Sequence, residues 1–100
     1  MEIIFEYHNV TASEALENFA TEKINKLVEK YQMVIRADVF FKTENTTSDE
    51  TGMICNIRLS LPGPRLFAEA SHSNFRDSIS ESINDLERQL RKRKEKMINY

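Results

Sequence analysis

Apolar side chains recur at helical spacing in the C-terminal stretch, residues 74–96. They fall at intervals of four, four, three and four residues, at Phe75, Ile79, Ile83, Leu86 and Leu90. This stripe predicts a helix that packs on a core along most of its length. Four consecutive basic residues follow at positions 91–94. Because successive residues point about 100° apart around a helix axis, these charges face nearly every direction, and we expect this end of the helix to project from the core.

A second helical stripe occupies the segment from residue 11 to about residue 32. Its apolar members are Leu16, Ala20, Ile24, Leu27 and Tyr31. Thr11 followed by Glu14 matches a capping box, so we expect the helix to begin near Thr11 or Ala12. Three lysines at positions i, i+3 and i+7 line one flank of the helix, namely Lys23, Lys26 and Lys30.

Four shorter segments alternate apolar and polar side chains with the period of two that half-buried strands show. They cover residues 2–8, 34–42, 53–61 and 65–71. The alternation places Ile35 in the buried set of the second strand and Met53 in that of the third.

Turn and cap residues separate these segments. Residues 44–52 contain no apolar side chain and are expected to form an exposed loop, and Pro62-Gly63-Pro64 predicts a tight turn. Ser73 or Asn74 is expected to cap the last helix.

The predicted order is therefore β-α-β-β-β-α. A helix between the first two strands implies that they pair in parallel, and the short connections that follow imply an antiparallel meander. Two amphipathic helices and four strands predict an α+β fold, a two-layer sandwich with a four-stranded mixed sheet and both helices on one face. The other face of the sheet would be wet.

Composition limits the chain to one domain, residues 1–100, with a single core. No apolar run approaches the 18 residues of a membrane span, and the N-terminal residues lack the features of a signal peptide. The only cysteine, Cys55, cannot form an internal disulfide, which fits a reducing cytoplasm. We therefore expect a cytoplasmic protein with no membrane partner.

The charge is distributed unevenly along the chain. The formal net charge is −2, yet residues 86–100 hold six basic and two acidic side chains, a local charge of +4. Residues 1–85 therefore carry −6. The basic end of the last helix is a candidate contact for an anionic partner.

Four stretches carry a resemblance to a known family. They are Glu6-Tyr7-His8-Asn9, the KLVEKY run at 26–31, the IRADV run at 35–39 and, most specific, LERQLRK at 86–92. In these the chain resembles the ribosome hibernation-promoting factors, a family also called ribosome-associated inhibitor A or sigma-54 modulation proteins. Phe75 stands where the family usually has Tyr, and Ser80 replaces an acidic residue.

The resemblance implies a fold like that of double-stranded-RNA-binding domains and a role in translation regulation during stress and stationary phase. The implied partner is the small ribosomal subunit with its 16S rRNA, bound in the decoding region so that messenger and transfer RNA are blocked. The chain would correspond to the short form of the family, without the C-terminal dimerisation domain of the long forms. No small-molecule substrate is implied.

The candidate RNA-binding residues are the lysine row and a basic helical tail over residues 88–96. They are Lys23, Lys26, Lys30, Arg88, Arg91, Lys92, Arg93, Lys94 and Lys96. If both helices share one sheet face, the row and Arg88, Arg91 and Lys92 would form one cationic surface. Simpler readings are that the tail offsets the helix dipole and that the lysines cover the core edge. Solvated strand charges are the default reading for Arg36, Lys42 and Arg58.

No arrangement of residues predicts catalysis, a cofactor or a metal site. His8, His72 and Cys55 are scattered without metal-ligand spacing, and Gly52 and Gly63 cannot form a glycine-rich phosphate loop. We therefore expect a non-enzyme. A general double-stranded-RNA-binding module and a protein–protein adaptor that regulates transcription remain the alternatives.

Overall fold

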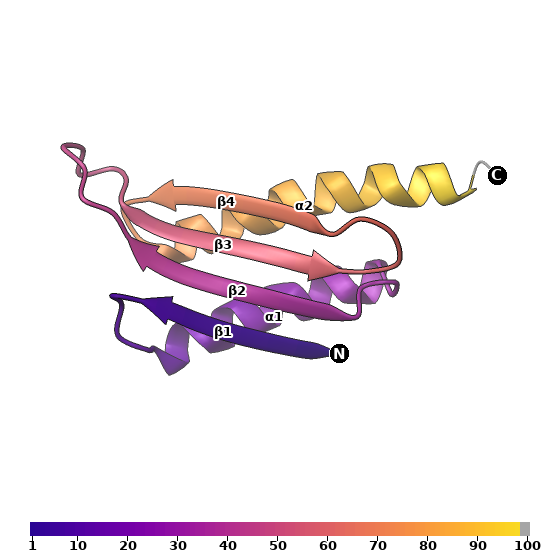
Figure 1. Cartoon of the computed structure of the whole chain (residues 1–100), viewed down its shortest axis with the longest axis horizontal. Helices are drawn as coiled ribbons and strands as arrows, with labels where there is room; N and C mark the ends of the chain where they lie inside the picture. The colour runs from indigo at the N-terminus through magenta and orange to yellow at the C-terminus, as the bar shows by residue number, and fades with distance from the viewer. Residues whose placement is uncertain (99–100) are drawn as a thin grey trace.

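The computed structural model describes residues 1–98, with side chains described up to Lys96. Its elements follow the order β-α-β-β-β-α, which confirms the prediction (Figure 1). They are β1 (Glu2–His8), α1 (Glu14–Lys30), β2 (Arg36–Thr43), β3 (Met53–Ser60), β4 (Leu66–His72) and α2 (Phe75–Ile98).

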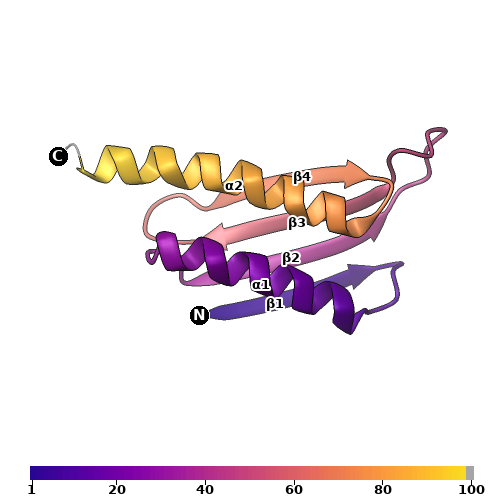
Figure 2. The ribbon, with the colours of Figure 1, turned by 180° about the vertical axis from the view of Figure 1, so that it is seen from behind.

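One mixed sheet with strand order β1-β2-β3-β4 forms the first layer. β1 pairs in parallel with β2, and the other two pairs are antiparallel, as expected. Both helices lie side by side on the same face of the sheet and run in the same direction, while the opposite face is open (Figures 1 and 2). The predicted α+β sandwich is therefore confirmed.

The core lies between the sheet and the two helices. Ile24, Leu86 and Leu90 from the helices are fully buried against Ile57 and Leu59 of β3. The aromatic part of this core is centred on a strand residue, whose ring packs against three others: Phe41 contacts Phe5, Tyr7 and Phe75. The helix stripes read from the sequence are therefore the faces that pack.

Two serines allow α2 to pack closely on the sheet. Ser78 and Ser82 are buried, one turn apart on the helix. Their hydroxyls donate to the backbone carbonyls of Met53 (2.5 Å) and Cys55 (3.1 Å) on β3. Buried hydroxyls need such partners, so these bonds satisfy both serines and tie the position of α2 to β3.

Helix α1 begins later than its capping-box pattern predicts. The N-cap is Ser13, whose Oγ accepts a hydrogen bond from the backbone N of Leu16 at 3.2 Å. The choice of Thr11 was wrong because Ser13 immediately precedes the first helical residue, where an N-cap must lie. For α2, Asn74 is the cap rather than Ser73, since its Oδ1 accepts from the backbone N of Asp77 at 2.9 Å.

Two strand residues were assigned to the wrong environment. Ile35 is 63% exposed because β2 begins only at Arg36, so Ile35 belongs to the preceding connection. Met53, the first residue of β3, is 36% exposed, whereas its neighbour Ile54 is buried. Alternation therefore gives the wrong exposure at these two positions, one just before the start of β2 and one at the start of β3.

Candidate nucleic-acid interface

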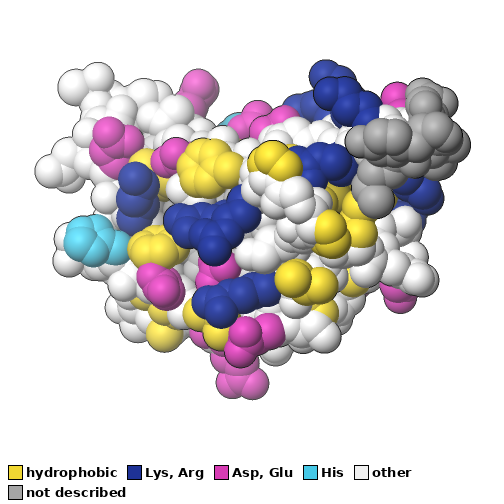
Figure 3. Space-filling model, turned by 45° about the vertical axis from the view of Figure 1, so that its right-hand side comes forward, with side chains coloured by type: hydrophobic (Ala, Val, Ile, Leu, Met, Phe, Trp, Pro, Cys, Tyr) yellow, Lys and Arg dark blue, Asp and Glu magenta, His cyan; other side chains and the backbone are white. Residues whose placement is uncertain are grey.

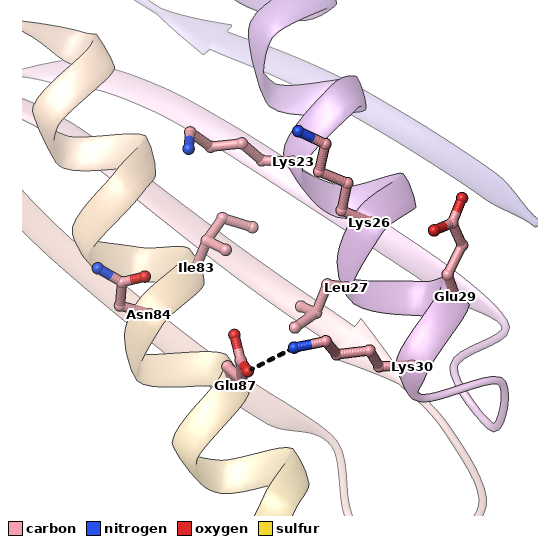
Figure 4. Close-up of a pocket in the computed structure, with 8 residues that line it drawn as sticks. All are labelled: Lys23, Lys26, Leu27, Glu29, Lys30, Ile83, Asn84 and Glu87. Atoms are coloured by element: carbon pink, nitrogen blue, oxygen red, sulfur yellow. Dashed lines mark hydrogen bonds and ion pairs between the residues drawn. The ribbon is translucent and has the colours of Figure 1, made fainter.

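A groove runs between the two helices on the covered face of the sheet. Its volume is about 500 Å³, and its floor of apolar side chains is flanked by lysines of α1 and polar side chains of α2 (Figure 4). The lining residues are Lys23, Lys26, Leu27, Glu29, Lys30, Ile83, Asn84 and Glu87.

The predicted lysine row forms one wall of this groove. Leu27 is buried, and the spacing i, i+3, i+7 places Lys23, Lys26 and Lys30 along the same flank of α1. The side chains of Lys26 and Lys30 are 73% and 69% exposed. Each ammonium group has one carboxylate partner, Glu22 for Lys26 and Glu87 for Lys30, both at 3.5 Å, but the exposed side chains remain open to a ligand from solvent.

Glu87 links the cations of the two helices. Its Oε1 lies 3.5 Å from Nζ of Lys30 and 3.6 Å from a guanidinium nitrogen of Arg91. Such partly exposed pairs contribute about 1 kcal/mol or less each. Glu87 thus brings positive charge from α1 and α2 together without neutralising both groups.

The basic groove continues past the last turn of α1. A second hollow of about 360 Å³ is lined by Lys30, Tyr31, Arg91, Lys94 and Glu95. Nζ of Lys94 lies 5.6 Å from the centroid of the Tyr31 ring, a cation–π contact. Lys94 therefore faces the lysine row, as Arg91 does.

Arg76 extends this line of charge at the opposite end and was missed in the sequence. Its Cζ lies 4.8 Å from the ring centroid of Phe19, and Nζ of Lys23 lies 5.2 Å from the same centroid. Arg76 precedes Glu87 by 11 residues, which is three helical turns, so both share one side of α2. That periodicity is the signal by which the sequence could have revealed Arg76.

Arg93 does not project freely from the helix end. Its guanidinium donates to the carbonyls of Pro62 (3.2 Å) and Pro64 (2.9 Å) in the β3–β4 turn. The expectation that charges at 91–94 surround an isolated helix end was therefore wrong at Arg93, because the turn reaches beneath this part of α2.

Arg88 lies on a different side of α2 from the lysine row. It pairs with Asp85 at 3.4 Å, and Gln89 on the same side donates to the carbonyl of Phe67 on β4 at 2.9 Å. Lys92 and Lys96 follow Arg88 at intervals of four residues, so they continue this outer side. Of the three α2 residues expected to join the lysine row, only Arg91 does so.

Two groups with raised pKa values, one buried and one partly buried, give no indication of catalysis. Burial raises the pKa of the Cys55 thiol to about 12, so it stays protonated and unreactive at neutral pH. Desolvation, with a 2.5 Å hydrogen bond to Glu17, raises the pKa of Tyr7 to about 12. Within residues 1–98, no group of three His, Cys, Asp or Glu side chains is placed to hold a metal ion.

Comparison with known families shows which family this chain belongs to. A model described as Sigma 54 modulation protein / S30EA ribosomal protein matches residues 3–98. The chain belongs to this family. Membership confirms both the resemblance noted in the sequence and the prediction of a non-enzyme, since the named relatives are hibernation factors.

Several named relatives align along most of the chain. The ribosome hibernation promoting factor of Salmonella typhimurium is 31% identical over 90 residues, which are 90% of this chain and 90% of that protein. Its counterpart from Klebsiella oxytoca is 29% identical with the same coverage. The ribosome hibernation promotion factor of Deinococcus radiodurans is 27% identical over 84% of this chain but only 44% of its own length.

Solved structures share the fold. A ribosomal subunit interface protein from Coxiella burnetii superposes with a TM-score of 0.80 at 21% identity, covering 94% of this chain and 98% of that one. The N-terminal domain of Thermus thermophilus Protein Y gives a TM-score of 0.73 at 20% identity, covering 91% and 93%.

Neither α1 nor the described part of α2 is both long and apolar enough to cross a bilayer.

Proposed function

We propose that the chain is a ribosome hibernation factor that binds the small ribosomal subunit and inhibits translation by occupancy. Residues 1–100 would act as one ribosome-binding domain in the cytoplasm during stress or stationary phase. The observation that carries this proposal is the basic groove between α1 and α2 (Figure 4). Family membership directs the proposal to the ribosome.

The groove has the chemistry that folded RNA requires. Its cations form a line along two neighbouring helices: Lys23, Lys26, Lys30, Arg76, Arg91 and Lys94. Structured RNA is bound mainly through phosphates and 2′-hydroxyls arranged by its shape, which exposed ammonium and guanidinium groups contact directly. Asn84 adds an amide that can donate to or accept from a ribose.

Dipole compensation explains only part of this charge. The C-terminal ends of α1 and α2 lie toward the same end of the molecule, so Lys30, Arg91 and Lys94 offset both negative poles (Figure 2). Lys23 lies about two turns before the end of α1, and Arg76 lies in the first turn of α2, where the helix dipole disfavours a positive charge, so dipole compensation explains neither. An anionic ligand that lies along the whole groove would explain the cations at the helix ends as well as Lys23 and Arg76.

The predicted RNA-binding residues then divide into three roles. The cations of the groove contact rRNA of the decoding region, where the protein would exclude messenger and transfer RNA. The outer side of α2, with Arg88, Lys92 and Lys96, contributes longer-range attraction. Arg93 supports the β3–β4 turn rather than the RNA.

Cosedimentation with purified small subunits through a sucrose gradient tests the proposal. The wild-type chain should comigrate with the subunit and saturate near one molecule per particle. In a cell-free system, inhibition should reach its limit at the same ratio and be relieved by excess initiation components. Inhibition far below one molecule per ribosome would contradict occupancy, and equal affinity for any RNA hairpin would favour a general double-stranded-RNA-binding module.

A further inference from the structure

The open face of the sheet carries a separate hollow, on the opposite side of the molecule from the helix groove. Its volume is about 320 Å³. It is lined by Glu6, Arg36, Asp38, Phe40, Asn56, Arg58, Ser60 and Arg65. Lys and Arg side chains gather in the middle of this face, with hydrophobic side chains around them (Figure 3). The lining has three arginines against two carboxylates, so it is positive although the chain is negative as a whole.

The strand register sets aromatic rings beside polar groups across this face. On β3, Arg58 lies between Asp38 of β2 and Phe67 of β4. In the adjacent row, Asn56 lies next to Phe40. Side chains directly opposite on neighbouring strands have Cβ atoms about 5 Å apart, so each ring borders a hydrogen-bonding group.

The ion pairs of the face leave two arginines available. Both carboxylate oxygens of Asp38 accept from Arg36, at 2.9–3.2 Å, and Arg36 also lies 3.5 Å from Glu2. Arg58 thus has Asp38 as its cross-strand neighbour, yet that carboxylate is already occupied. Among residues 1–98, neither Arg58 nor Arg65 has an ion pair or a side-chain hydrogen bond.

Phe67 is the exposed aromatic of this arrangement. Its side chain is 49% exposed, beside the unpaired guanidinium of Arg58. Exposed aromatic rings on an open sheet stack with unpaired bases, and neighbouring arginines neutralise the phosphates or stack in turn. An apolar protein surface would instead favour a contiguous apolar patch, and charged or polar residues interrupt the apolar ones here.

We propose that this open face binds a short single-stranded RNA segment. One base stacks on Phe67, the backbone phosphates contact Arg58 and Arg65, and Asn56 hydrogen-bonds to the base beside Phe40. The inference is independent of the proposed helix-groove function. A chain held to a subunit through its helices would present this face on its far side, where a single strand can reach it.

Fluorescence anisotropy with labelled eight-nucleotide RNAs, one oligouridine and one of mixed sequence, tests this inference on the whole chain. Phe67→Ser and Arg58→Gln should each weaken binding by roughly fivefold or more, the loss expected for one base stack or one charged contact. Met53→Ser is the matched control, an exposed apolar residue at the first position of β3, five residues from Arg58, and should bind as the wild type does. Circular dichroism verifies that each variant is folded.

The two proposals can fail separately. Phe67→Ser and Arg58→Gln should still cosediment with small subunits, whereas Lys26→Gln in the helix groove should leave oligonucleotide affinity unchanged. If the wild type and both sheet variants bind the oligonucleotides equally, or none binds, the inference is overturned and a protein ligand becomes the better occupant of this face. Either result leaves the helix-groove proposal standing.

Discussion

The ammonium group of Lys30, in the last turn of α1, lies 3.5 Å from the carboxylate of Glu87 on α2 (Figure 4). These residues are 57 positions apart in the chain. Their contact shows that the lysine row and one side of α2 face each other across the groove. It also separates the basic residues of α2 into those that share this groove and those that do not.

The first prediction compares how much the basic residues of the groove and those on the outer side of α2 contribute to binding the small subunit. A variant with Lys26→Gln, Lys30→Gln and Arg91→Gln should bind small subunits roughly tenfold or more weakly, which corresponds to about 0.5 kcal/mol for each lost contact. The matched variant, Arg88→Gln, Lys92→Gln and Lys96→Gln, loses the same charge from the outer side. It should bind within about threefold of the wild type. Gradient cosedimentation measures both, and a larger loss in the outer variant would show that the groove is not the main contact.

Salt should weaken this binding strongly. If about five phosphates are neutralised, the logarithm of affinity should fall with the logarithm of salt concentration at a slope of roughly −3.5 to −4.5. Titration at several ionic strengths gives the slope. The groove variant should show a shallower slope than the wild type, and a wild-type affinity independent of salt would rule out phosphate contacts.

Leu86 should be essential to the fold. It is fully buried where α2 crosses the sheet, and Leu86→Ala removes a side chain with little room for the core to relax. We expect a loss of roughly 2–5 kcal/mol in the free energy of unfolding. Urea denaturation measures it, with the exposed Asn84→Ala as control, expected to change stability by about 0.5 kcal/mol or less. A loss below about 1 kcal/mol for Leu86→Ala would contradict the observed docking of α2.

Gly63 should resist substitution because of its backbone and its neighbour. Its φ is +92°, and a Cβ there would lie 3.3 Å from Nη1 of Arg93. Gly63→Ala should therefore destabilise the chain by about 1–3 kcal/mol, mainly through backbone strain. In an Arg93→Ala background, Gly63→Ala should still lower the free energy of unfolding by most of this amount, because the positive φ of residue 63 is unchanged. If the cost disappears there, contact with Arg93 and not strain is responsible.

Stability should decline in alkaline solution. The pKa of Cys55 rises from 9.0 to about 12 and that of Tyr7 from 10.0 to about 12 on folding. The folded chain thus holds more protons than the unfolded chain between these values, so the contribution is complete below about pH 9 and is lost as pH rises toward 12. Urea midpoints at pH 7 to 11 measure the decline, which Tyr7→Phe should reduce above pH 10. A midpoint unchanged up to pH 11 would contradict it.

The amino-acid sequence by itself determined the element order, the fold class and the packed face of each helix. Those features follow from local periodicity, because a residue's place on a helix or strand face depends on spacing alone. The stripe from Ile79 to Leu90 and the lysine row from Lys23 to Lys30 are both examples. Periodicity predicted the ends of elements less accurately. The structure has Ser13 rather than Thr11 as the cap of α1, and Ile35 lies just before β2 rather than within it.

Only the tertiary structure decided which charges meet. Lysine and arginine side chains are long, and each gains little from any single surface contact, so the sequence carries no strong preference for a partner. The docking of α2 beside α1 placed Arg76, Arg91 and Lys94 toward the lysine row. The same docking turned Arg88 toward the outer side, and the path of the β3–β4 turn brought two carbonyls to Arg93. These outcomes depend on distances between segments remote in the chain, which periodicity along it cannot encode.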